Sequence, residues 1–176
     1  MKAIVIYFSW DGKVERMAKN ILSKIEADEF RIVEVEKYPE EKLALCARVS
    51  QELFDGARPE YMGDVDISGY DTIVFGCPIW AHQLPPVVRT FIERHDFLRP
   101  AGSKRAELER EGKTVWPFCS CLTKLDAPKV SEIARACKGC VAKEGFAAAD
   151  DDTNGLERWV EKINTNDHEL TTNYQK

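Results

Sequence analysis

The residues of this chain with the clearest chemical potential lie in one short turn, Ser9–Val14 (Ser-Trp-Asp-Gly-Lys-Val). The turn follows an apolar run from Ala3 to Phe8 and precedes apolar residues at helical spacing. Such a run is typical of a strand buried on both faces of a parallel sheet. A turn from this kind of strand into a helix aims backbone N–H groups and the positive helix end at one point. The sequence therefore predicts a phosphate-binding loop here.

Six cysteines offer a second kind of chemistry. Cys119-x-Cys121 and Cys137-x-x-Cys140 could together form a four-thiolate metal or cluster site. However, the first pair leaves a strand at its carboxyl end, and the second follows the next helix, roughly 15 Å away. Cys137-x-x-Cys140 also ends a helix instead of opening one, so it lacks the dipole that lowers a thiol pKa. We expect reduced thiols with no metal site, and favour a packing role for Cys137 over a redox pair.

Composition narrows the class of protein. The chain has 176 residues, with 25 Lys and Arg against 30 Asp and Glu, and a net charge of −5. This charge argues against nucleic acid or an anionic membrane as the main partner. No apolar stretch approaches the length of a membrane span, and no charged-then-apolar leader precedes the first strand. Together with the thiols, these features predict a cytoplasmic protein.

Strand and helix patterns alternate along the chain. Strands are predicted at 3–8, 30–35, 72–77, 114–118 and 141–147, and helices at 14–25, 39–54, 85–92, 126–137 and 154–163. Asp126 and Asn154 are the predicted helix caps. This order predicts an α/β domain over residues 1–164, a doubly wound five-stranded parallel sheet with helices on both faces. Residues 165–176 form a polar tail, and 99–112 is a charged insertion of unassigned role.

A ligand of such a sheet binds outside the carboxyl ends of the strands. Three loops meet that edge: 9–14, 78–86 and 118–123. Several motifs of this chain resemble flavodoxin-like proteins of the longer-loop type, and the resemblance covers residues 3–164. These motifs are Tyr7-Phe8-Ser9-Trp10-x-Gly12, Arg58-Pro59, Tyr70-Asp71-x-Ile73-x-x-Gly76-x-Pro78-Ile79-Trp80, and Pro85-Pro86-Val87 with Phe91.

The resemblance implies strand order 2-1-3-4-5, which is the order of flavodoxin itself, with noncovalently bound FMN and one- or two-electron transfer. No residue of the sequence has a convincing role as a catalytic acid, base or nucleophile. Trp80 would stack on the isoalloxazine, or pack against the helix after it. His82 would contact the flavin or face solvent. The implied cofactor-binding residues are Ser9, Trp10, Asp11, Gly12, Lys13, Val14, Pro78, Ile79, Trp80, Ala81, His82, Cys119 and Ser120.

The phosphate loop departs from the family pattern Ser/Thr-x-Thr-Gly-x-Thr. Asp11 and Val14 stand where two threonines belong, and lost hydrogen bonds to a charged group cost about 1.5–3 kcal/mol each. Asp11 would also repel the phosphate if its carboxylate faced inward. If Asp11 instead capped the helix and pointed away, it would leave the backbone amides of the loop free. The sequence thus predicts weak FMN binding.

Two functions remain open. One is an FMN-binding electron carrier or small flavin-dependent reductase, with a redox partner protein or small-molecule acceptor. The other is a flavodoxin-fold module that has lost FMN and serves in binding or regulation.

Overall fold

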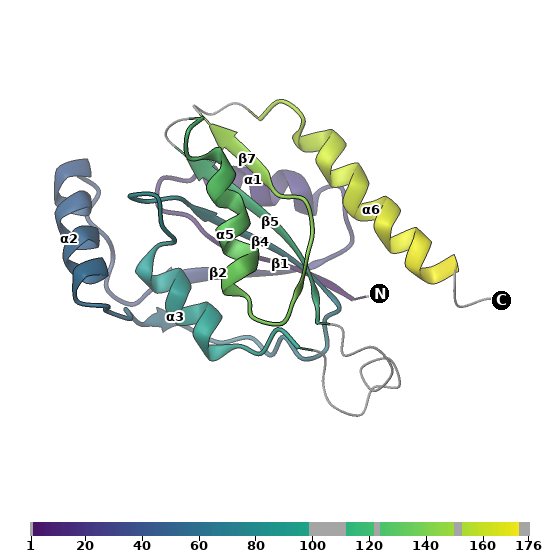
Figure 1. The fold of residues 1–176 in the computed structure, drawn as a ribbon, viewed down its shortest axis with the longest axis horizontal. Helices are drawn as coiled ribbons and strands as arrows, with labels where there is room; N and C mark the ends of the chain where they lie inside the picture. The colour runs from purple at the N-terminus through teal and green to yellow at the C-terminus, as the bar shows by residue number, and fades with distance from the viewer. Residues whose placement is uncertain (1, 99–111, 122–123, 150–152, 173–176) are drawn as a thin grey trace.

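A computed structural model describes residues 2–98, 112–121, 124–149 and 153–172, and shows a sheet with helices on both faces (Figure 1). Strands β1 (Ala3–Phe8), β2 (Asp28–Glu34), β4 (Thr72–Pro78) and β5 (Thr114–Cys121) form its parallel centre in the order β2-β1-β4-β5. Strands β1, β4 and β5 are buried along their whole length, as their continuous apolar runs predict, whereas β2 is partly exposed. The predicted α/β flavodoxin-like fold is confirmed.

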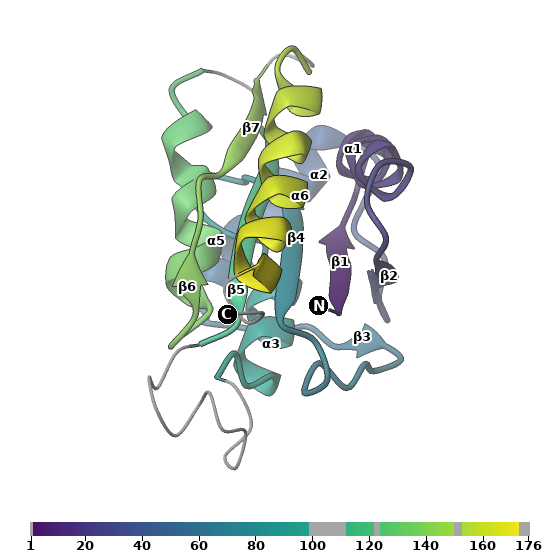
Figure 2. The same cartoon turned by 90° about the vertical axis from the view of Figure 1, so that its right-hand side faces the viewer.

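Two helical layers enclose the sheet (Figure 2). Helices α1 (Lys13–Leu22) and α6 (Leu156–Thr172) cover one face, where their apolar residues pack on Tyr7 and Trp116. Helices α2 (Lys42–Phe54), α3 (Pro86–Arg94) and α5 (Val130–Ala136), the last preceded by a short 3₁₀ turn at Ala127–Lys129, lie on the other face. Among the described residues no helix is long and apolar enough to cross a membrane.

Several predicted boundaries shift for local reasons. Helix α2 begins at Lys42 instead of residue 39, because the Glu41 carboxylate accepts hydrogen bonds from the Leu43 and Ala44 amides. Helix α6 continues past residue 164, where the polar tail was predicted to begin, and ends at Thr172. The domain boundary itself stays a prediction. Of the insertion predicted at 99–112, all but Gly112 lies outside the described residues.

The predicted fifth strand is in fact two short ones. β6 (Val141–Ala142) pairs with the start of β5, and β7 (Phe146–Ala149) pairs with its end. The break lies beside Pro117, which has no N–H to donate to a neighbouring strand. A proline inside β5 thus explains why its outer partner is interrupted.

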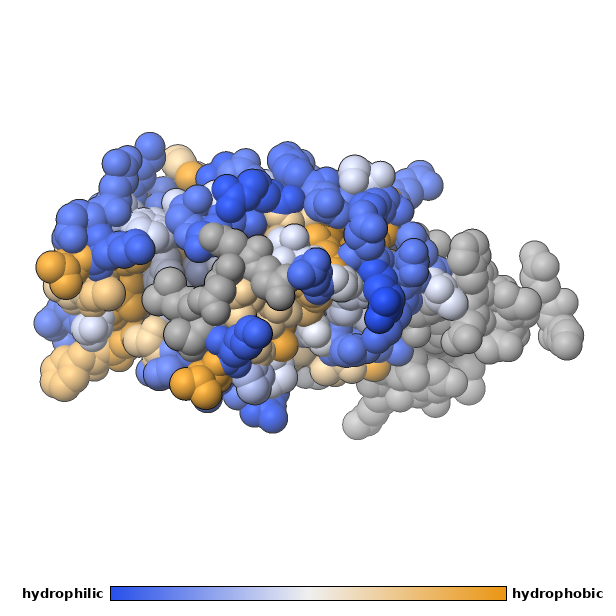
Figure 3. All heavy atoms as spheres, turned by 90° about the horizontal axis from the view of Figure 1, so that it is seen from above, coloured by the Kyte–Doolittle hydropathy of each residue, from blue (hydrophilic) through white to orange (hydrophobic). Residues whose placement is uncertain are grey.

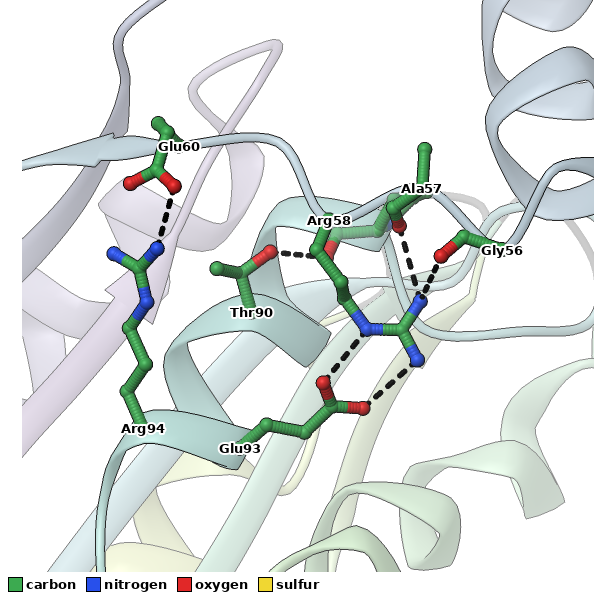
Figure 4. A network of polar contacts seen from close by, with 8 residues as sticks. Gly56, Ala57, Arg58, Glu60, Thr90, Glu93 and Arg94 are labelled. Atoms are coloured by element: carbon green, nitrogen blue, oxygen red, sulfur yellow. Dashed lines mark hydrogen bonds and ion pairs between the residues drawn. The ribbon is translucent and has the colours of Figure 1, made fainter.

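An additional strand, β3 (Tyr61–Met62), pairs antiparallel with β2 and was not predicted. Two arginines tie this edge to α3 (Figure 4). Arg58 makes a two-point ion pair with Glu93 at 2.7 and 2.8 Å, and Arg94 lies 2.5 Å from Glu60. The resembled Arg58-Pro59 motif therefore anchors the segment before β3.

Close packing between β4 and β5 depends on one glycine. Gly76 lies opposite Phe118 in the strand register, and a Cβ at Gly76 would lie 2.1 Å from the Phe118 ring. Any larger residue would push these two strands apart at the point where both approach the functional edge of the sheet.

Candidate functional site

A cavity of about 190 Å³ opens at the carboxyl edge of the sheet, between the β1–α1 loop, the β4–α3 loop and helix α2. Figure 3 shows the molecule from above, with apolar side chains gathered at the α2 end on the left. A second groove of about 290 Å³ shares Lys13 and Ser120 with the cavity and continues toward α6. The cavity is lined by Trp10, Asp11, Lys13, Lys42, Leu45, Cys46, Val49, Ser50, Pro78, Ile79, Trp80, Ala81, Ser120 and Cys121.

Two backbone N–H groups at the start of α1 are hydrogen-bonded to side chains of the preceding loop. The Lys13 N–H donates to Asp11 Oδ1 at 3.1 Å, and the Glu15 N–H donates to Ser9 Oγ at 3.1 Å. Gly12 is the N-cap, with φ 82°. The prediction that Asp11 caps the helix and leaves the amides free is therefore wrong, because Gly12 is the N-cap and Asp11 holds the Lys13 amide, while Ser9 holds the Glu15 amide. A bound phosphate would have to replace these internal acceptors.

The side chains of Val14 and Lys13 lie in different surroundings at this turn. The Val14 side chain is fully buried among the core residues beneath α1. Only the main chain of Val14 is therefore left to serve the predicted phosphate loop. Lys13 instead lines the cavity, with its Nζ 3.9 Å from Asp11 Oδ2.

Trp80 lines the cavity and also packs against three aromatic rings. Its ring centroid lies 5.0 Å from Tyr38, 5.6 Å from Phe8 and 6.4 Å from Trp10, all nearly perpendicular. Such edge-to-face pairs stabilise by about 0.5–1.5 kcal/mol each beyond area burial. Trp10 is fixed in turn by its indole N–H, which donates to Pro39 O at 2.9 Å. Trp80 is thus held in a defined orientation at the cavity wall.

Tyr38 is the best anchored of these rings. Its hydroxyl donates to Glu52 Oε2 at 2.8 Å, and the Arg48 guanidinium lies 4.5 Å from its ring centroid. Burial, followed by the Glu52 carboxylate, raises the pKa of Tyr38 well above its usual range. The phenol therefore stays protonated and serves to position Trp80.

A tight turn carries the predicted site residues Ala81 and His82. Trp80 and Gln83 exchange backbone hydrogen bonds of 3.0 and 2.8 Å across it. Ala81 has φ 46° and His82 φ 60°, both left-handed, which is the pattern of a type I′ turn that favours Asn and Gly. Non-glycine residues in this region cost of order 1 kcal/mol or more.

His82 does not line the cavity but reaches across to Asp126, between β5 and the 3₁₀ turn. Its Nδ1 is hydrogen-bonded to Asp126 Oδ1, and the imidazole is 71 % exposed while the Asp126 carboxylate is only 12 % exposed. Asp126 was predicted to cap the next helix, but it makes no side-chain capping bond to the 3₁₀ turn that follows. The pair joins the loops after β4 and β5.

The loop predicted at 118–123 is strand as far as Cys121, where β5 ends, and its thiols are buried. Cys119 lies opposite Cys77 in the β4–β5 register, and burial raises the pKa of both thiols well above the usual range. Cys137 packs in the same core cluster and also raises the pKa of Cys77. These thiols are protonated packing groups. No metal-binding cluster of His, Cys, Asp or Glu occurs in the part of the chain that the structure describes.

The structure brings eight of the predicted residues to the cavity and leaves five outside its wall. Those at the wall are Trp10, Asp11, Lys13, Pro78, Ile79, Trp80, Ala81 and Ser120, and those outside it are Ser9, Gly12, Val14, His82 and Cys119. Sequence reasoning missed Cys121 and the α2 wall, namely Lys42, Leu45, Cys46, Val49 and Ser50. The apolar spacing of Leu45 and Val49 signals a helix face, but not that this face meets the cavity.

A sequence profile described as Flavodoxin matches residues 2–163. The chain belongs to the flavodoxin family. No curated protein matches it at a significant level.

Solved structures with the flavodoxin fold agree with this membership. A Bacteroides uniformis protein assigned as a flavoprotein is 27% identical, with a TM-score of 0.70 over 91% of this chain and 97% of that one. A Lactobacillus acidophilus flavoprotein in complex with FMN is 20% identical, with a TM-score of 0.64 over 90% and 97%. A Bacillus anthracis azoreductase is 12% identical, with a TM-score of 0.51 over 94% and 100%. The last two show a common fold alone.

Proposed function

We propose that this flavodoxin-family protein binds FMN and transfers electrons through it, as a shuttle or as a small flavin-dependent reductase. The observation that carries the proposal is the cavity between the start of α1 and the anchored Trp80. It lies at the edge of the parallel sheet where such folds bind ligands. The FMN complex of the Lactobacillus acidophilus flavoprotein, which shares the fold, supports the choice of flavin.

The cavity wall suits a flat heteroaromatic ring. Trp80 offers an indole face, while Leu45, Val49 and Ile79 supply apolar contact. The volume of about 190 Å³ is below the roughly 300 Å³ typical of small-molecule pockets. A whole FMN would therefore extend into the adjoining groove beyond Lys13 and Ser120.

The phosphate end fits less well than the ring end. Lys13 and Lys42 place positive charge at the cavity, but Asp11 opposes a phosphate and holds the Lys13 amide. We infer that the ring supplies most of the affinity and the phosphate little. The predicted weak binding thus has a structural cause at Asp11 and Ser9.

Bound flavin would supply the redox chemistry. The chain's residues would orient and shield it: Phe8, Trp10 and Tyr38 fix the plane of Trp80, and apolar side chains exclude water from the ring. Electrons would pass to a redox partner protein or a small-molecule acceptor. The six free thiols fit a reducing cytoplasm, and neither nucleic acid nor a membrane is a proposed partner.

The alternative is a module that kept the flavodoxin fold and lost the flavin. The internal bonds from the Lys13 and Glu15 amides favour it, because they satisfy without a ligand the donors that a phosphate would use.

Visible flavin absorbance of purified protein, followed by FMN titration monitored by fluorescence quenching, separates the two functions. We expect saturable one-to-one binding. An absence of binding at millimolar FMN would refute the proposed function and leave the binding module.

A further inference from the structure

The groove that continues from the cavity toward α6 differs in chemistry from the cavity itself. The cavity wall is mostly apolar and aromatic, whereas most described side chains of the groove are polar, namely Lys13, Arg16, Asn20, Ser120 and Thr153. The charged ones among them are both cations, Lys13 and Arg16, and none is an acid. The cavity and the groove meet at Lys13 and Ser120, which line both. A ligand with a flat ring in the cavity would therefore place an anionic end in the groove.

Ser120 supplies a hydrogen-bonding group that the fold itself does not use. Its backbone is fixed, because Ser120 O accepts the Ile79 N–H at 2.9 Å and the residue pairs with Pro78 on one side and Ala148 on the other. The residue is only 7 % exposed, yet its hydroxyl has no hydrogen-bond partner among the described residues. A buried hydroxyl is unfavourable unless something bonds it. At the junction of cavity and groove, this hydroxyl is placed to bond a ligand.

Arg16 adds a charged donor to the same groove. It is exposed on α1, and its guanidinium makes no hydrogen bond or ion pair with a described residue. Nearby acids of the same helix start are turned elsewhere: Glu15 Oε2 lies 3.0 Å from Arg31, and Asp11 lines the cavity but not the groove. Residues 150–152, three aspartates, lie outside the described residues. A guanidinium with unpaired N–H groups matches the oxygens of a phosphate.

We propose that Ser120, Arg16 and the Lys13 side chain form a phosphate subsite in this groove, which binds a phosphate of the flavin ligand outside the β1–α1 loop. The inference rests on the proposed flavin binding. Within the loop, Asp11 and Ser9 already accept the N–H groups that a phosphate would use, and a phosphate in the groove needs neither donor. The Lys13 N–H would join the subsite only when Asp11 no longer holds it.

Two flavins carry the phosphate chemistry that this subsite fits. FMN has a phosphate monoester, and FAD has a diphosphate that continues into an adenosine. A further groove of about 480 Å³ at the start of α6 shares Asn20, Thr153 and Leu156 with the first one. The surface beyond the subsite is therefore hollowed far enough for a ligand longer than FMN.

The test compares three flavins by calorimetric titration into the parent protein and its variants. We expect Arg16→Gln to weaken FMN and FAD binding about 5-fold, as loss of a solvent-exposed ion pair does, with riboflavin binding unchanged. Ser120→Ala should have a similar effect, because it removes the hydroxyl. Arg135→Gln is the matched control, since Arg135 is exposed on α5, pairs with Glu132 and lines neither the cavity nor the groove. Loss of FAD affinity alone would support the subsite and assign it to the diphosphate.

A second readout is the nuclear magnetic resonance signal of the Arg16 side chain. FMN should shift the Arg16 Nε–H signal in ¹⁵N spectra, and riboflavin should not. An unchanged ratio of FMN to riboflavin affinity in Arg16→Gln would overturn the inference, as would FMN shifts confined to the Lys13 and Glu15 N–H signals, which would place the phosphate in the loop. In both cases the proposed function stands. Failure of every form to bind any flavin would instead refute the proposed function, and the subsite with it.

Discussion

Replacing Asp11 by threonine is expected to tighten FMN binding while leaving riboflavin binding unchanged. In the structure the Asp11 carboxylate holds the Lys13 N–H at 3.1 Å and lies at the cavity wall. Threonine removes the negative charge and this competing acceptor, and adds a hydroxyl that can donate to phosphate. Riboflavin carries no phosphate, so it isolates the ring contribution.

The size of the effect follows from the freed donor. A hydrogen bond from an amide to a charged phosphate contributes about 1.5–3 kcal/mol, which corresponds to roughly a 10- to 150-fold change in the dissociation constant. Removing the repulsion between the Asp11 carboxylate and the phosphate adds to this gain in binding free energy. Two like charges about 4 Å apart near a protein surface cost about 4 kcal/mol at most. We therefore expect at least about a 10-fold gain for FMN.

The assay is parallel titration of FMN and riboflavin by fluorescence quenching. Asp66→Thr is the matched control, because Asp66 Oδ1 accepts the Ser68 N–H at 2.8 Å in the same local arrangement, away from the cavity. It should leave both affinities unchanged. An unchanged ratio of FMN to riboflavin affinity in Asp11→Thr would show that this carboxylate does not face the phosphate.

Four further outcomes are expected. Val14→Thr should lower the free energy of unfolding by about 1–2 kcal/mol in urea without tightening FMN binding, because it places a hydroxyl in the core beneath α1. Trp80→Ala should weaken FMN binding by about 1–2 kcal/mol and also lower the apo melting temperature, since three rings pack on this side chain; an unchanged apo melting temperature would contradict that packing. Cys137→Ala should leave flavin binding and reduction intact, with a modest packing cost measured by thermal unfolding. Arg58 holds the pKa of the Glu93 carboxyl below that of an ordinary glutamate. The stability from this pair is therefore present above the unfolded-state pKa of Glu93 and is lost as pH falls through its folded-state pKa. Arg58→Gln should flatten the acid side of a plot of unfolding free energy against pH.

The fold could be predicted because its central strands are continuous apolar runs separated by amphipathic helices. β3 escaped prediction because two residues carry no periodic signal, and antiparallel pairing with β2 depends on the rest of the fold. The split of the last strand had a visible cause in Pro117, but the position of the break depends on strand register.

The candidate site was predictable where residues lie at or just beyond the carboxyl ends of the strands, as Ser120 and Trp80 do. The α2 wall was not, since a helix pattern gives its apolar face but not its tilt over a neighbouring loop. The internal acceptors Asp11 and Ser9 were the hardest to predict. Which backbone N–H donates to each of these side chains depends on the detailed geometry of the turn. Residue types alone do not determine that geometry.

Both edges of the sheet end in very short strands, and this has a consequence for behaviour at high concentration. An exposed long strand is a template on which another chain can add, which is how sheet proteins associate into fibres. β3 has two residues and stands beside the ion pairs of Arg58 and Arg94, while β6 and β7 have two and four residues on either side of a break. The β6–β7 edge offers no such length of backbone, whereas β3 pairs only with Val33 and Glu34, so Asp28–Ile32 of β2 has no strand partner on its outer side among the described residues. The charged side chains of Asp28, Glu29 and Arg31 on this stretch oppose the addition of another chain there.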